Sequence, residues 1–363
     1  MSKLFESPKF REVALRNRIV VSPMCEYSSI DGFANDWHLV HLGSRAVGGA
    51  GLILTEANAV TPDGRISPED LGIWSDAHVG PLARIVRFCE AQGAVVGTQL
   101  AHAGRKASTA VPWRSREAVS PQDGGWRPIW APSAIAYDDG WIVPTALDES
   151  GIAAIAQAFG AAAQRALDAG MRVIELHAAH GYLLHTFLSP LSNRRSDRYG
   201  GSFENRARLT LEVVAAIRAV WPERLPLFVR LSASDWVPGG WNIDESVELA
   251  RLLKGRGVDL IDASSGGLAP AQQIVTGPGF QVPFAARIRR EAGIATGAVG
   301  MITTAAQAED ILNAQDADLI VIARELLRDP YWPLHAAREL GDDVRWPNQY
   351  QRAKPEPAVP STR

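Results

Sequence analysis

Residues 150–178, SGIAAIAQAFGAAAQRALDAGMRVIELHA, decide the fold of this chain. The part 150–169 has apolar residues at helical spacing, and Ser150 and Gly170 are typical helix start and stop signals. The part 172–178, RVIELHA, is a short apolar run with little alternation, which is typical of a parallel strand covered on both faces. The stretch therefore predicts one unit in which an α-helix leads into a buried parallel β-strand.

The same kind of apolar run recurs along the chain. Seven further strands are predicted at 18–24, 51–57, 94–100, 227–233, 259–265, 295–301 and 318–324. Helical patterns such as 203–221 lie between them. Eight βα repeats favour a single closed (β/α)8 TIM barrel over an open doubly wound sheet, and the first run ends in SPMC and not in a Gly-rich dinucleotide motif. We expect this barrel to be one domain over residues 1–340, because such barrels are long for single domains.

Two segments do not fit the repeat. Residues 103–145 follow the third strand, are rich in Trp, Pro and Gly, and show no helical period. A long insert there lies on the C-terminal face, where barrel active sites are found, and it predicts a lid or hairpin over the pocket; a packed surface loop is the alternative. Residues 341–363 form a Pro-rich C-terminal tail, which we expect to be extended.

Composition excludes several classes of protein. The formal net charge of −3 and the lack of any Lys/Arg run argue against a nucleic-acid partner. No stretch approaches the roughly 18 apolar residues of a membrane span, and MSKLFESPKF has no apolar signal region. Cys25 and Cys89 are the two cysteines, too few for a disulfide framework or for an iron–sulfur cluster held by four thiolates of this chain. We expect a cytoplasmic protein without a membrane partner.

Polar residues gather where the predicted strands end. In a barrel these ends meet at one face, so their side chains would face one cavity. They are Cys25 and Tyr27 after the first strand, Gln99 and His102 at the third, His177, His180 and Tyr182 at the fourth, Arg230 in the fifth, Gly300 at the seventh and Arg324 at the eighth.

The residue types at three of these ends suggest an anionic ligand. The Gly-rich turn at Gly300 offers backbone N–H groups to a phosphate, and Arg324 would add a charge-assisted hydrogen bond. Arg230 would sit in a low-dielectric barrel mouth and needs an anionic partner there. A phosphate together with a delocalised anion describes a reduced flavin mononucleotide. The alternative is that Arg230 simply pairs with an acidic neighbour inside the barrel.

His177 and His180 allow three interpretations. With Cys25 they could ligate a metal, but zinc usually needs further protein ligands, and we therefore expect no metal here. They could be buried core histidines. They could also be neutral N–H donors that polarise a carbonyl or nitro oxygen, with Tyr182 as a proton donor two residues on.

These residues lie in motifs that resemble one known family. SPMCEYS at 22–28, TQLAHAGRKA at 98–107, HAAHGYLLHTFLSPLSNRRSDRYGGSFENRARL at 177–209, RLSASDW at 230–236, GAVGMI at 297–302 and IARELLRDP at 322–330 resemble the Old Yellow Enzyme family over almost the whole chain. The Cys after SPM is similar to the bacterial group often called thermophilic-like. The resemblance implies an NADPH dehydrogenase or ene-reductase. Such an enzyme uses non-covalent FMN to pass hydride from NADPH or NADH to alkenes activated by carbonyl or nitro groups.

The resemblance also implies roles for individual residues. Gln99 would bond the pyrimidine edge of the flavin, and Arg230 the locus of its anionic charge. His177 and His180 would hold the substrate oxygen, and Tyr182 would protonate the neighbouring carbon. Tyr27 would hydrogen-bond the ligand, and Cys25 would tune the flavin potential. A nucleophile or redox switch is the alternative for Cys25, but no resolving Cys lies close in sequence. The expected FMN contacts are Ser22, Pro23, Met24, Cys25, Ala57, Gln99, His177, Arg230, Gly300, Ala323 and Arg324.

The tail carries a further implication of the resemblance. Asn348-Gln-Tyr350-Gln-Arg352 is similar to a C-terminal motif that inserts an Arg into the active site of a neighbouring subunit. We therefore expect a homodimer or homotetramer in which Arg352 crosses the interface, the alternative being a plain polar tail. One departure from the family is Ala323, where relatives commonly have Gly; its methyl group would weaken FMN binding slightly or shift the loop.

Three rival functions stay open from the sequence. One is another flavin barrel enzyme, such as an amine or 2-hydroxy-acid oxidase. The second is a metal-dependent barrel hydrolase that uses His177 and His180. The third is a flavin-binding store or sensor without alkene chemistry.

Overall fold

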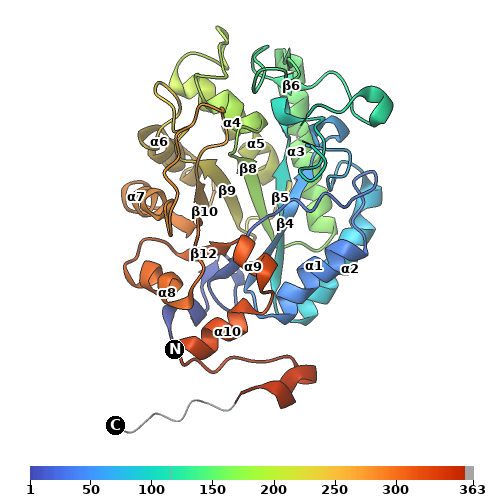
Figure 1. Cartoon of the computed structure of the whole chain (residues 1–363). Coiled ribbons are helices and arrows are strands. Elements are labelled where there is room, and N and C mark those ends of the chain that lie inside the picture. Colours follow the sequence, from blue (N-terminus) through green and yellow to red (C-terminus); the bar gives the residue numbers. More distant parts are fainter. Residues whose placement is uncertain (116, 356–363) are drawn as a thin grey trace.

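A closed barrel of eight parallel strands forms the centre of the protein (Figure 1). The computed structural model describes residues 1–115 and 117–355. The strand order around the barrel is β10-β11-β12-β3-β4-β5-β8-β9. The strands are β3 (Ile19–Val21), β4 (Leu52–Ala59), β5 (Val95–Ala101), β8 (Val173–Ala178), β9 (Leu227–Ser232), β10 (Leu260–Ser264), β11 (Ala295–Ala298) and β12 (Leu319–Ile322). Each lies within or close to one of the eight predicted runs, so the predicted (β/α)8 fold is confirmed.

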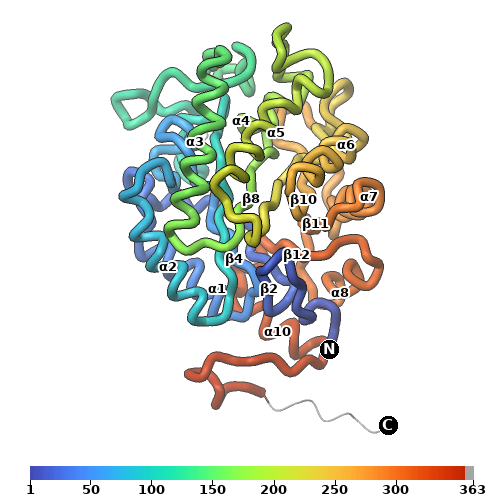
Figure 2. The backbone as a smooth tube through the Cα atoms, turned by 180° about the vertical axis from the view of Figure 1, so that it is seen from behind, coloured from blue at the N-terminus to red at the C-terminus, as the bar shows by residue number. Residues whose placement is uncertain are grey.

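Helices surround the barrel and cover the outer faces of its strands (Figures 1 and 2). They are α1 (Asp36–Val47), α2 (Val79–Ala91), α3 (Glu149–Asp168), α5 (Phe203–Val220), α6 (Ile243–Lys254), α7 (Val282–Ala292), α8 (Ala305–Asn313) and α10 (Trp332–Glu339), with the short α4 (Leu183–Leu188) and α9 (Arg324–Arg328). Because the strands are covered outside and packed inside, every residue of β8 and β9 is buried.

The predicted helix 150–169 is confirmed, but its start signal is not Ser150. The N-cap of α3 is Asp148, whose side chain accepts a hydrogen bond from the Gly151 N–H at 2.7 Å. The hydroxyl of Ser150 donates to the same carboxylate. A carboxylate at the positive end of a helix is a strong cap, so Asp148 takes this position. The predicted stop is confirmed, because Gly170 has a left-handed φ of 87° directly after the C-cap Ala169.

Strand register places the polar residues of the barrel beside one another. Gln99 of β5 is the partner of Glu175 in β8. His177 of β8 is the partner of Arg230 in β9, and Arg230 is in turn the partner of Asp262 in β10. Cross-strand partners point to the same side of a sheet, and Glu175 and His177 are two residues apart on one strand. All five side chains therefore share the interior of the barrel.

The insert and the tail lie at opposite ends of the molecule (Figures 1 and 2). In the insert, β6 (Trp130–Ala131) pairs in parallel with β7 (Thr145–Ala146), so these two strands are not the arms of a β-hairpin. In the tail, Asn348–Ala353 forms the short 3-10 helix η6, so this part is not extended as predicted. Residues 356–363 of the predicted tail lie outside the described residues. Across the part of the chain that the structure describes, no helix has both the length and the apolar character to cross a bilayer.

Candidate active site

The turn after β8 brings three of the predicted site residues together. The ring centroids of His177 and His180 are 5.1 Å apart, and those of His177 and Tyr182 are 4.9 Å apart, both in edge-to-face geometry. His180 has a φ of +59°, which a non-glycine residue adopts only when its surroundings hold it. Ser232 Oγ accepts a hydrogen bond from the His180 N–H at 2.9 Å, and Lys106 Nζ donates to the His180 carbonyl at 2.8 Å.

His177 presents an N–H donor to the site. Burial lowers the pKa of His177 well below its usual value, and the nearby Arg230 lowers it further, so the imidazole is neutral. Its Nδ1 accepts a hydrogen bond from the Ala179 N–H at 3.2 Å. A neutral imidazole that accepts through Nδ1 carries its proton on Nε2. His177 is therefore a neutral Nε2–H donor, as the third interpretation of the sequence requires.

His180 is engaged differently. Burial, followed by the charge of Arg230, also lowers the pKa of His180 well below its usual value. Its Nε2, however, lies 2.7 Å from Ser264 Oγ at the end of β10, and Ser264 Oγ is 3.4 Å from Gln281 Oε1. The Nε2 atom of His180, which was expected to hold a substrate oxygen together with His177, is therefore hydrogen-bonded to Ser264 in this structure. Ser264 was not among the predicted site residues, although a polar residue at the end of a barrel strand is the signal that identified the others.

A buried group of charges lies beneath the histidines. Arg230 donates from one terminal nitrogen to Ser22 Oγ at 3.0 Å, and its Nε lies 3.3 Å from Asp262 Oδ2. Gln99 donates to Glu175 Oε1 at 2.7 Å. The pKa of Glu175 is raised by burial and by the charge of Asp262, while Arg230 opposes the shift. Arg230 thus has the acidic neighbour that the alternative interpretation proposed. Glu175 and Asp262 were missed, although each is the single acidic residue of a buried strand.

The residues present also fit a flavin mononucleotide. Arg230 Nε is buried and faces Asp262 Oδ2 at 3.3 Å, but it completes no hydrogen bond among the described residues, so the protein alone does not satisfy the guanidinium fully. Gly300 has a φ of 116°, and a Cβ there would lie 3.1 Å from Gln281 and Phe280, so the turn needs glycine. Arg324, the first residue of α9, is exposed, and within residues 1–115 and 117–355 it has no hydrogen bond or ion pair. Its N-terminal neighbour Ala323 is the N-cap of α9.

The remaining predicted cofactor residues lie along two neighbouring strands. Pro23, Met24 and Cys25 directly follow β3, and Ala57 lies in β4 at a shift of register. Burial raises the pKa of the Cys25 thiol well above its usual value, and the nearby Asp70 and Glu56 raise it further. The thiol is therefore protonated at neutral pH, which is the opposite of an activated nucleophile.

A cavity of about 480 Å³ opens beside Tyr182 and Tyr27. Tyr182 and Tyr27 line it together with residues of the insert and two neighbouring loops: Ile66, Lys106, Thr109, Ala110, Pro112, Tyr137, Asp138, Trp141 and Pro270. Burial raises the pKa of Tyr182 well above its usual value, with smaller contributions from Cys25 and Tyr27. Tyr27 has a left-handed φ of 46° and its ring meets that of Trp113 edge to face at 5.7 Å. Among the described side chains, His, Cys, Asp and Glu form no group of three that could hold a metal ion.

Arg352 does not join this site within its own chain. It lies exposed in η6. The tail before it lines cavities with Arg16, Asn17, Gly49 and Gln92, which precede strands β3, β4 and β5. The tail therefore runs along the N-terminal face of the barrel, at the opposite end from Tyr182.

Comparisons with known proteins agree with this geometry. Residues 3–343 match the model of the NADH:flavin oxidoreductase / NADH oxidase family. The chain is 52% identical over 353 residues to an NADPH dehydrogenase of Halalkalibacterium halodurans, covering 97% of this chain and 98% of that protein. Morphinone reductase is similar in structure, with a TM-score of 0.78 and 28% identity over 96% of this chain and 92% of the other. An old yellow enzyme homologue from Zymomonas mobilis shares the fold, with a TM-score of 0.76 at 24% identity over 98% and 99% of the two chains.

These likenesses confirm three expectations from the sequence. The resemblance to the Old Yellow Enzymes is confirmed. The enzyme is a flavin oxidoreductase of the NADPH dehydrogenase kind. Its cofactor is FMN and its reductant is NAD(P)H. The barrel, the site at its strand ends and the match over residues 3–343 together show that this chain belongs to the NADH:flavin oxidoreductase / NADH oxidase family.

Proposed function

We propose that the protein is an FMN-dependent NAD(P)H:alkene oxidoreductase that reduces C=C bonds activated by carbonyl or nitro groups, with Tyr182 as the proton donor. The observation that carries this proposal is the contact of His177 with Tyr182. A neutral N–H donor and a protonated phenol lie edge to face at 4.9 Å, and His177 is the cross-strand neighbour of the buried Arg230. An activated alkene needs one group that polarises its oxygen and another that protonates its carbon.

FMN, when bound, supplies the hydride carrier that alternates between nicotinamide and alkene in a ping-pong cycle. Ser22, Pro23, Met24, Cys25, Ala57, Gln99, His177, Arg230, Gly300, Ala323 and Arg324 would hold it. Gln99 donates to Glu175 through its amide nitrogen, which leaves its carbonyl oxygen to accept from the pyrimidine edge. Arg230 would stabilise the negative charge of the reduced ring, and Arg324 with the Gly300 turn would bind the phosphate.

His177 would donate its Nε2–H to the carbonyl or nitro oxygen of the substrate. A buried neutral donor that is already oriented stabilises charge developing on that oxygen without reorganisation. His180 would provide a second donor when its ring exchanges Ser264 for the substrate oxygen. Tyr27, which lines the same cavity, would add a hydrogen bond to the ligand.

Tyr182 would give its proton to the α-carbon. The raised pKa of Tyr182 keeps its phenol protonated at neutral pH, so the proton leaves only when the neighbouring carbon becomes strongly basic. Cys25, a neutral thiol beside the cofactor residues, would tune the potential of the flavin and take no covalent part.

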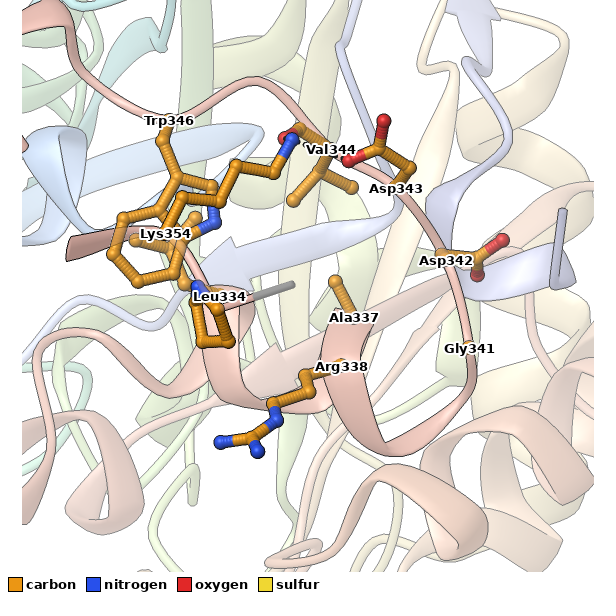
Figure 3. Close-up of a pocket in the computed structure, with 10 residues that line it drawn as sticks. Leu334, Ala337, Arg338, Gly341, Asp342, Asp343, Val344, Trp346 and Lys354 are labelled. Carbon is orange, nitrogen blue, oxygen red and sulfur yellow. Dashed lines mark hydrogen bonds and ion pairs between the residues drawn. The ribbon is translucent and has the colours of Figure 1, made fainter. Parts of the chain in front are cut away.

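The position of the C-terminal tail bears on which active site Arg352 could reach. Figure 3 shows Trp346 and Lys354 of the tail around a cavity of about 160 Å³ against Leu334 and Ala337 of α10. Since this is the N-terminal face of the barrel, Arg352 could reach an active site only on another copy of the chain. We therefore propose a homodimer or homotetramer in which Arg352 crosses the interface.

An anaerobic absorption titration tests the proposed function. NADPH added to the FMN-loaded protein should bleach the flavin spectrum, and 2-cyclohexenone should restore it. Bleaching without restoration would contradict the alkene substrate class and leave the cofactor in place. Fast reoxidation by oxygen with an amine or hydroxy-acid donor would instead indicate an oxidase of the same fold.

A further inference from the structure

One wall of the active-site cavity has no part in the proposed chemistry. It is formed by Tyr137 and Trp141 of the insert, whose rings meet edge to face with centroids 4.7 Å apart. Both side chains are half-buried, and both line the cavity that Tyr182 lines. The cavity therefore has the proton donor and an aromatic pair among its walls.

Two consecutive cationic residues, Arg105 and Lys106, connect the aromatic wall of Tyr137 and Trp141 to the turn at His180. Arg105 donates to the carbonyl of Ala136, directly before Tyr137, at 3.0 Å and to the carbonyl of Leu268 at 2.7 Å. Lys106 Nζ lies 4.1 Å from the centroid of the Tyr137 ring and donates to the carbonyls of His180 and Gly267. The insert, the turn at His180 and the loop after β10 are thus tied together. The distance from the wall to Tyr182 is set by the protein itself.

The size and chemistry of the cavity indicate what the wall receives. A volume of about 480 Å³ lies within the range of about 300–1,000 Å³ that is typical of small-molecule pockets, so the cavity has room for a substituent beyond the activated alkene itself. Beside the aromatic residues, Ile66, Pro112 and Pro270 contribute apolar lining, and Thr109 and Asp138 contribute polar lining. Lys106 is already engaged by carbonyls and the Tyr137 ring, and Asp138 adds a carboxylate, so the lining does not favour an anionic ligand. Aromatic side chains gain most from another aromatic ring, packed edge to face or offset.

We propose that Tyr137 and Trp141 form a ring-binding subsite that selects alkenes bearing an aryl group over alkenes with a small substituent. This inference rests on the proposed function. The oxygen of the substrate would be held at His177, its α-carbon would lie at Tyr182, and its aryl group would extend to the wall. The subsite would act on substrate affinity and on orientation, and not on the transfer of hydride or proton.

Two substrates that differ only at this subsite provide the test. In trans-β-nitrostyrene a phenyl group replaces the methyl group of 1-nitropropene, while the activating nitro group is the same. The measured quantity is the ratio of kcat/KM for nitrostyrene to kcat/KM for nitropropene in the FMN-loaded protein. Trp141→Ala should lower this ratio by about tenfold, through KM, because it removes one aromatic contact and its buried area. Trp141→Phe, which keeps a ring, should restore most of it.

The controls separate this inference from the function on which it rests. Val143→Ala changes an exposed residue of the same insert and should leave the ratio unchanged. If Trp141→Ala holds less FMN or unfolds, Trp141→Leu gives the same comparison with a bulky side chain. A fall of less than about threefold in the ratio of a folded variant overturns the subsite while the reductase stands. A wild-type protein that reduces neither nitroalkene overturns the proposed function and this inference with it.

Discussion

The strand ends of β8–β10 and the C-terminal tail differ in what holds them. At the strand ends, Arg230, His177 and His180 are each fixed by hydrogen bonds or ion pairs to residues of the same barrel. In the tail, Lys354 pairs with Asp343 and Gln351 donates to the Trp346 carbonyl, both within the tail itself. The ring of Tyr350 reaches the barrel at Tyr331, with centroids 6.2 Å apart.

This difference separates two ways in which a residue becomes functional. A side chain at a barrel strand end is positioned when the chain folds, because the register of neighbouring strands determines what it meets. A residue such as Arg352, exposed and held by local contacts, acquires a function only when another surface covers it. The predictions below test this contrast, from the largest effect to the smallest.

Tyr182→Phe should have the largest effect. Removal of a general acid typically costs about 10²–10⁴-fold in rate, so we expect a loss of this size in alkene reduction. Reduction of the flavin by NADPH needs no proton from Tyr182 and should be nearly unchanged. Stopped-flow measurement of the two half-reactions checks this. Equal slowing of both would remove Tyr182 from the role of proton donor.

Arg230→Met should destabilise the barrel. The change leaves Asp262 buried without its cation, and the loss of one partner of a buried ion pair typically costs about 3–5 kcal/mol. Urea unfolding of the FMN-free protein measures this effect without the contribution of the cofactor. The matched control is Arg84→Met, whose pair with Asp36 is exposed and should be worth less than about 1 kcal/mol. Equal losses in the two variants would contradict the buried network.

His102 should make stability depend on pH. Burial lowers the pKa of His102, at the end of β5, to about 4. Its ring therefore stays neutral in the folded protein, while in the unfolded chain it takes up a proton near pH 6.5. Its contribution to stability is present above pH 6.5 and is lost as the pH falls toward 4. At pH 5 this loss amounts to about 2 kcal/mol relative to pH 7.5.

The variant His102→Gln isolates this contribution from those of the other titrating groups. Between pH 7.5 and pH 5, urea unfolding should show that the wild-type protein loses about 2 kcal/mol more than the variant. Parallel pH profiles of wild type and His102→Gln would contradict the prediction.

Arg352→Ala should have the smallest effect, and it should change substrate binding and leave stability unchanged. The urea midpoint of the barrel should not change, because the Arg352 side chain is exposed and makes no hydrogen bond or ion pair with the residues that the structure describes. If the residue contributes a charge-assisted hydrogen bond across an interface, KM for the alkene should rise by about tenfold. Lys354→Ala, which removes a pair inside the tail, should leave KM unchanged. Unchanged KM and turnover in Arg352→Ala would leave the tail without a role in the active site.

Sequence reasoning reached most of the fold but only part of the site. All eight strands were predicted from short apolar runs, since a strand buried on both faces is visible in its composition alone. The residues at the strand ends followed from the barrel. Glu175 and Asp262 were missed because their runs were interpreted as apolar strands. Ser264 was missed because the adjacent serines at the end of its strand do not indicate which side chain either of them meets. Hydrophobic periodicity also does not predict that Asp148 caps α3 in place of Ser150, or that residues 348–353 form a 3-10 helix.

The sequence by itself determined the barrel, the family and the set of polar residues at one end, because these depend on local patterns and on motifs that stay contiguous along the chain. The tertiary structure alone decided which of those residues meet. The proton lies on His177 Nε2 because Nδ1 accepts from the Ala179 N–H. His180 Nε2 is hydrogen-bonded to Ser264, a serine 84 residues away in the sequence. The aromatic wall depends on Lys106 and Arg105, which join loops far apart in sequence. Contacts of this kind arise from strand register and loop packing in three dimensions, and no single stretch of sequence records them.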